Sequence, residues 1–300
     1  MQKIKNLVIA LLMIVAAGLG GAKAYLDHQL GIELDKSINS VADKVIIEYT
    51  QISTSLIGSV IINNLQLIAP DYAPVHIETI TLDRAYQFYD PNKLPEQISI
   101  AVENIHIPIS DTADEPPVLM SAFGYAPYYL SQRELRGLGY TYINADIYFQ
   151  AKLINNNKIS LSVRVNAEAW GNLILSADLI NVPAPALLPK AASQIQLAAL
   201  ALTYIDNGFI NQVFKWLAQR QKMTERRFKL LLISKLKNDL SQVPMTLDAS
   251  VAASLQQFIQ SPNRLTIRLQ PNPPLKINAL MTTSPKRLGL KMTTLERIQE

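Results

Sequence analysis

Residues 142–180 read YINADIYFQAKLINNNKISLSVRVNAEAWGNLILSADLI, and nearly every second side chain in them is apolar. This period of two is the pattern of a β-strand with one buried and one solvated face. Residues 155–157 (Asn-Asn-Asn) and Gly171-Asn172 interrupt the pattern, and both suit turns because Asn and Gly tolerate left-handed backbone angles. The stretch therefore predicts an antiparallel meander with one apolar and one polar face.

Upstream, from Val45 to Ile109, the same alternation recurs but slips by one residue at three points. The slips fall across Asn63-Asn64, Glu78-Thr79 and Glu103-Asn104. A one-residue slip turns the following apolar side chains to the wrong face unless a β-bulge absorbs it. We therefore expect three bulged or bent strands in a strongly twisted sheet.

Beyond residue 190 the apolar spacing becomes helical. Asp206, Thr224 and Asp248 each precede such a pattern and can cap a helix. The resulting prediction is an α+β fold, mainly an antiparallel twisted β-sheet with an inserted helical region and an N-terminal transmembrane helix. Its expected parts are a membrane anchor or signal segment at 1–25, an antiparallel β domain at 26–190, a helical region packing on the sheet at 191–262, and C-terminal strands and a tail at 263–300.

The N-terminal prediction depends on the uncharged run LVIALLMIVAAGLGG at residues 7–21, which follows Lys3 and Lys5. A run of this kind inserts into a bilayer as a helix, and the preceding lysines favour a cytoplasmic N-terminus. Residues 22–24 (Ala-Lys-Ala) have the form of a signal-peptidase site, whereas Tyr25 suits the interface of an uncleaved anchor. We expect an anchored protein of the inner membrane, single-pass, with the bulk of the chain in the periplasm; cleavage is the alternative.

Motifs for chemistry are few. The chain has no cysteine, and its three histidines are isolated, without metal-ligand spacing. No G-x-S-x-G elbow, Walker loop or G-x-G-x-x-G fingerprint is present. Ser234 and Lys237 match S-x-x-K, but they lie in a basic helical pattern without the companion motifs. We therefore expect no enzyme activity, no cofactor and no metal, and an exported domain has no nucleic acid to bind.

Charge is distributed unevenly along the chain. The net charge of +4 combines a balance of −7 over residues 1–150 with +11 over residues 151–300. The segment from Lys215 to Lys237 contains many of the basic side chains, and on an amphipathic helix such a composition suits anionic lipid headgroups. The predicted headgroup-binding residues are Arg226, Arg227 and Lys229. The alternative is an ordinary solvated helix face.

The apolar face of the sheet leaves a similar choice open. Either the helices cover it and close a conventional core, or part of it remains as a groove for acyl chains. On the second interpretation the predicted lipid-binding residues are Ile143, Ile147, Phe149, Leu161, Val163 and Leu175.

Residues 49–67, YTQISTSLIGSVIINNLQL, resemble the opening strands of the AsmA-like envelope proteins. The shared elements are a short N-terminal anchor, a polar-flanked strand, a Leu-x-Gly turn at residues 56–58 and an alternating strand at 60–67. The resemblance implies a periplasmic β structure tethered to the inner membrane, with a groove that handles lipids. This chain departs from the pattern by its short length and by its basic helical insertion, and no functional residues carry over.

Together these observations predict a noncatalytic, membrane-anchored periplasmic protein that binds or passes lipid in maintenance of the cell envelope. Its partner would be membrane lipid. The alternative is a structural or assembly subunit of a bacterial envelope complex, which would use its charged ends to dock on an envelope protein partner.

Overall fold

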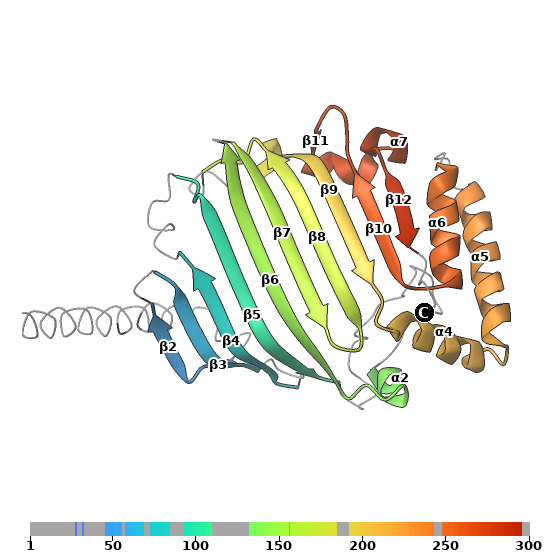
Figure 1. The fold of residues 1–300 in the computed structure, drawn as a ribbon, viewed down its shortest axis with the longest axis horizontal. Helices are drawn as coiled ribbons and strands as arrows, with labels where there is room; N and C mark the ends of the chain where they lie inside the picture. The colour runs from blue at the N-terminus through green and yellow to red at the C-terminus, as the bar shows by residue number, and fades with distance from the viewer. Residues whose placement is uncertain are drawn as a thin grey trace, which may run out of the picture.

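A computed structural model shows one large antiparallel sheet with helices gathered at one end (Figure 1). The structure describes residues 46–55, 58–68, 73–84, 93–109, 132–155, 157–184, 192–242 and 248–295, together with positions 28 and 32. The expected anchor at 1–25 lies outside the described residues. Among the helices of the described part, none has the length and apolar character needed to cross a membrane.

Twelve strands make up the described sheet. They are β1 (Ile46–Glu48), β2 (Gln51–Thr54), β3 (Val60–Ile68), β4 (Val75–Asp83), β5 (Gln97–Pro108), β6 (Tyr142–Asn155), β7 (Lys158–Ala167), β8 (Gly171–Ile180), β9 (Gln196–Ile205), β10 (Arg264–Leu269), β11 (Leu275–Lys276) and β12 (Lys291–Leu295). The helices are α2 (Gln132–Gly137), α4 (Phe209–Arg220), α5 (Glu225–Gln242), α6 (Ala249–Gln260) and α7 (Pro285–Leu288), with 3₁₀ turns η3 (Ala192–Gln194) and η4 (Ile277–Thr282).

The strands follow one another across the sheet in the order β1-β3-β4-β5-β6-β7-β8-β9-β10-β12, with β2 also beside β3 and β11 also beside β9. Every ladder is antiparallel. The prediction of a mainly antiparallel α+β fold is confirmed, and the meander predicted over residues 142–180 is the run β6-β7-β8. C-terminal strands β10 and β12 join this same sheet.

The register aligns apolar side chains into rows that cross the sheet. Directly facing positions connect β4 to β10 through Leu82, Ile100, Phe149, Val163, Leu175, Leu202 and Ile267. Since side chains alternate between the two faces of a strand, the intervening polar residues form the opposite face. The sheet therefore has one apolar face that continues across at least seven strands.

The three predicted slips lie at one level of the sheet. Asn64 in β3 and Asn104 in β5 have φ angles of 51° and 53°. Glu78 of β4 lies between them and is skipped in the registers of both its ladders. Against β6, strand β5 contains one extra residue between Val102 and Ile105. A register shift therefore accompanies the slip in β5 alone, whereas β3 and β4 keep an unshifted register with each other and Asn64 supplies a left-handed backbone in β3.

The helices form a core of their own at the end of the sheet. Its fully buried side chains include Val213, Phe214 and Leu217 of α4, Phe228 of α5 and Leu135 of α2. Helix α6 connects this core to the sheet by packing on β10 and β12.

Residues 196–205 form a strand, β9, in the interior of the sheet, so the helical region begins at Phe209 rather than at 191. This corrects the predicted boundary. The run QLAALALTYI is apolar or small on both faces, and it therefore lacks the polar alternation that identifies a strand in sequence.

The predicted caps at Thr224 and Asp248 are confirmed, whereas the N-cap of α4 is Gly208 and Asp206 lies two residues before it. The backbone N–H of Ile210 donates to Asp206 Oδ1 at 3.0 Å, at the start of α4. The N–H of Arg227 donates to Thr224 Oγ1 at 3.3 Å, at the start of α5. Asp248 accepts from the backbone N–H of Ser250 in α6 at 2.8 Å; the Ser250 side chain first, and this backbone N–H second, lower the pKa of the Asp248 carboxyl group.

Candidate functional site

The residues predicted to bind acyl chains lie in the middle of the apolar face. Val163 of β7 faces Phe149 of β6 on one side and Leu175 of β8 on the other. Ile147 and Leu161 are the next residues on the same face of β6 and β7. All five side chains are half-buried. The structure therefore brings these residues together as one patch.

Ile143, the sixth predicted residue, belongs to the same face of β6 but lies nearer its start. It packs against the helical core rather than in the central patch.

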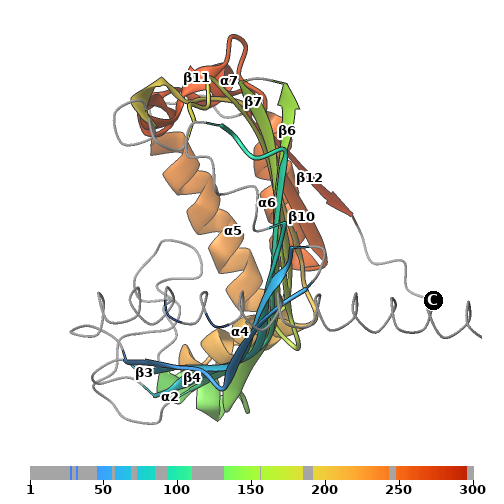
Figure 2. The same ribbon diagram turned by 90° about the vertical axis from the view of Figure 1, so that its left-hand side faces the viewer.

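The helices cover the apolar face at the far end of the sheet. Phe258 of α6 meets Tyr204 of β9 edge to face, with ring centroids 6.2 Å apart. Figure 2 shows the sheet from its side, with α5 lying to one side of it. On the central strands the apolar side chains are less enclosed, and Leu173 of β8 is 38% exposed. The apolar face is thus covered by helices at one end and more exposed on its central strands.

The predicted headgroup residues lie on α5, away from the acyl patch. Figure 1 shows α5 beyond β12, whereas β7 is central. Arg226 and Arg227 are exposed. Lys229 instead pairs with Glu225 at 2.7 Å and donates to the carbonyl of Gln260 at 3.2 Å. The structure therefore leaves the two arginines facing solvent and directs the lysine into the helix bundle.

Helix α5 also differs from the amphipathic pattern expected of it. Phe228 and Leu232 are buried, but Leu230 and Leu231 are 56% and 39% exposed. The sequence spacing predicts that Leu231 belongs to the buried stripe of α5. In the structure α5 instead packs on α4 and α6 through a neighbouring stripe.

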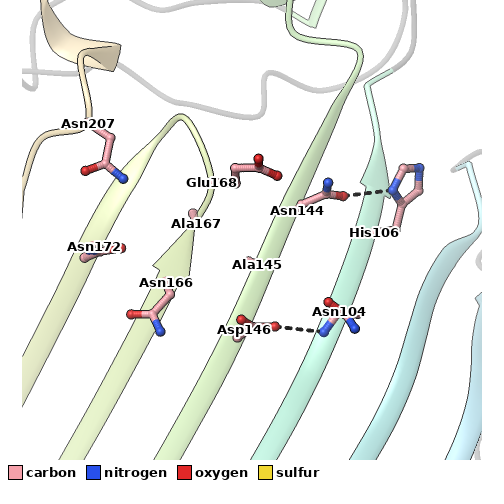
Figure 3. A pocket seen from close by; sticks show the side chains of 10 residues that line it. All are labelled: Asn104, His106, Asn144, Ala145, Asp146, Asn166, Ala167, Glu168, Asn172 and Asn207. Atoms are coloured by element: carbon pink, nitrogen blue, oxygen red, sulfur yellow. Dashed lines mark hydrogen bonds between the residues drawn. The ribbon is translucent and has the colours of Figure 1, made fainter.

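The polar face of the sheet contains a depression of about 450 Å³ (Figure 3). Its lining residues come mainly from β5, β6, β7 and β8. They are Asn104, His106, Asn144, Ala145, Asp146, Asn166, Ala167, Glu168, Asn172 and Asn207. Four of them follow the register across adjacent strands, in the order Asn104, Asp146, Asn166 and Asn172.

Hydrogen bonds organise one side of this depression. His106 Nδ1 lies 2.9 Å from Asn144 Oδ1, and the backbone N–H of Asn104 donates to Asp146 Oδ1 at 2.9 Å. The side-chain amide of Asn104 also donates to the carboxylate of Glu78, which lies at the same level of the neighbouring strand β4. The bulge therefore shapes the depression, because it turns the backbone N–H of Asn104 toward β6 while the side-chain amide reaches β4.

Two tyrosines of β6 flank the depression on the polar face. Tyr142 is 46% exposed, and its ring lies 4.7 Å from that of His106. Tyr148 is 36% exposed, and its hydroxyl donates to Glu103 Oε1 at 3.3 Å. Desolvation and the neighbouring Asp146 and Glu103 carboxylates raise the pKa of the Tyr148 hydroxyl.

The sequence alone did not predict this depression. Alternation identifies its residues as polar and outward-facing, but only the register shows that they are neighbours. Within the described residues, no group of three or more His, Asp or Glu side chains is placed to hold a metal ion.

These features define an α+β protein built on one twisted antiparallel sheet with an apolar and a polar face. A family model described only as "Uncharacterized protein" matches residues 164–294, from within β7 to β12. Comparison with curated proteins and with solved structures gives no match.

Proposed function

We propose that the protein binds or passes lipid along the apolar face of its sheet, as a noncatalytic component of envelope maintenance. The observation that supports this most directly is the apolar row from Leu82 to Ile267, half-buried where it crosses β6, β7 and β8. A continuous apolar surface of this kind favours a ligand that is itself long and apolar.

The size of the effect is sufficient for acyl chains. Each methylene removed from water contributes about 0.8 kcal/mol, so a chain that buries about eight methylenes gains about 6 kcal/mol before ordering costs. The covered end of the sheet, where Phe258 packs on Tyr204, would form the closed end of such a groove.

Membrane placement is part of the proposal. The apolar run at residues 7–21 would anchor the chain in the inner membrane with its bulk in the periplasm. The resemblance of residues 49–67 to AsmA-like proteins supports the same location. Arg226 and Arg227, which face solvent on α5, are available to anionic headgroups at the helical end of the sheet.

The experiment is native mass spectrometry of the full chain, purified from a bacterial envelope in detergent without added lipid. We expect bound phospholipid in the unmodified protein and its loss in Val163→Asp. Ser162→Asp is the matched control, because it places the same charge one residue away on the opposite face. Circular dichroism establishes that both variants fold.

A lipid-free mass for the unmodified protein, or equal lipid in Val163→Asp and Ser162→Asp, would refute lipid binding at this face. Co-purification with a stoichiometric protein partner would then favour the assembly-subunit alternative.

A further inference from the structure

The polar face of β6 carries aromatic and polar side chains that take no part in the proposed lipid binding. Tyr142, Asn144, Asp146 and Tyr148 share this face because side chains alternate along a strand. Each tyrosine exposes a third or more of its surface, and the amide and the carboxylate lie between the two rings. Tyr142 contacts His106, a lining residue of the depression, whereas Tyr148 lines a neighbouring depression on the same face.

The chemistry of the depression selects among ligands. Its five asparagines each offer donors and an acceptor, while Asp146 and Glu168 accept. None of the described residues that line it is Lys or Arg, so an anionic group would find no opposite charge there. The lining suits a neutral ligand with many hydroxyl or amide groups.

Unused hydrogen-bonding capacity lies at the centre of the site. Asn166 and Asn172 face each other across β7 and β8, and in the described part of the chain neither side chain has a hydrogen-bonding side-chain partner. Figure 3 shows Asn166 between Asp146 and Asn172 on successive strands, with Glu168 and Asn207 further along the depression. These groups can bond a ligand without breaking an internal contact.

We propose that this depression binds a neutral oligosaccharide. Sugar hydroxyls require donors and acceptors side by side, and the apolar C–H faces of sugar rings pack on exposed aromatic rings such as Tyr142, which lies beside His106. The row from Asn104 to Asn172 crosses four strands, a span of about 14 Å at the usual strand separation. This length matches several linked sugars better than one. The site is on the face opposite the lipid patch, so it is independent of that function.

The test is isothermal titration calorimetry of the full chain with the hexasaccharide of N-acetylglucosamine, whose acetamido groups complement side-chain amides. The detergent must contain no sugar headgroup. We expect saturable binding that weakens at least tenfold, about 1.4 kcal/mol, in the double variant Asn166→Ala/Asn172→Ala. Tyr142→Ala should weaken binding as well. The matched control is Ser160→Ala/Ser176→Ala, on the same face of β7 and β8 but outside the depression.

No binding by the unmodified protein would overturn the proposal, as would equal affinities for the site variant and the control variant. Inorganic phosphate that binds as tightly as the sugar would also overturn it. Val163→Asp, which tests the lipid patch, should keep its affinity for the oligosaccharide, so the two proposals fail separately.

Discussion

The left-handed backbone at Asn64 of β3 predicts a sharp difference between two adjacent asparagines. Asn64 has φ 51°, a left-handed angle, and its side chain is exposed, so its substitution removes little packing. Asn63 pairs with Thr79 and Gln51 as an ordinary strand residue. Valine is therefore expected to be tolerated at 63 and unfavourable at 64.

The magnitude follows from the backbone. A left-handed angle costs an L-residue about 1–2 kcal/mol, and a β-branched side chain is at the upper end of that range. We expect Asn64→Val to lose about 2 kcal/mol of unfolding free energy. Asn64→Gly should lose none of this, because glycine adopts positive φ without a steric penalty. Asn63→Val should change stability by less than about 1 kcal/mol.

Urea unfolding of the full chain in mild detergent, followed by circular dichroism, measures these differences. With a denaturant slope of about 3 kcal/mol per molar, 2 kcal/mol lowers the midpoint by about 0.7 M. Equal midpoints for Asn64→Val and Asn63→Val would refute the left-handed backbone at Asn64. Equal losses for Asn64→Val and Asn64→Gly would show that the side chain, rather than the backbone angle, carries the effect.

Further predictions concern the helical core, a turn and two titrating groups. Phe214→Ala should cost about 3–5 kcal/mol in urea unfolding because the ring is fully buried; a loss below 1 kcal/mol would contradict that packing. Gly171→Ala should lower the melting temperature, since the added Cβ would lie 2.5 Å from the carbonyl oxygen of Ile205; an unchanged value would contradict the close approach. The pKa of Asp248 is lower in the folded state than its ordinary value of 3.8, so its carboxylate stabilises the fold above that value. This stabilisation is lost as the pH falls through the folded-state pKa. Asp248→Ala should therefore reduce the decrease in unfolding free energy measured between pH 5 and 2. Burial raises the pKa of Tyr204, so stability should fall above about pH 10, where the unfolded tyrosine ionises, and Tyr204→Phe should remove part of that fall.

Local patterns in the sequence predicted much of the fold. Alternation over residues 142–180 predicted three strands and their two faces, because the period of a strand is a property of neighbouring residues. The turn after Asn155 was also predicted, whereas the second turn lies at residues 168–170 and the predicted turn residues Gly171 and Asn172 belong to β8. The slip at Asn104 predicted the bulge of β5 for the same reason, and the slip at Asn64 coincides with a left-handed backbone angle in β3. Caps such as Asp248 were also predictable, since a cap bonds a backbone group only two residues away.

Other features depended on contacts between distant segments. Strand β9, at residues 196–205, lacks alternation and is a strand because β8 and β10 pair with it on either side. The burial of Phe228 and the exposure of Leu231 follow from the face that α5 turns toward α4 and α6. Lys229 pairs locally with Glu225, but its bond to Gln260 required the packing of two helices.

Both candidate sites combine these two kinds of information. Sequence alone assigned Val163 to an apolar face and Asn166 to a polar one, because alternation is local. Only the tertiary structure placed Val163 between Phe149 and Leu175, and Asn166 beside Asn172. The reason is physical: the register between strands is set by all the cross-strand contacts together, and a shift of one residue would exchange the two faces without changing the alternation within either strand.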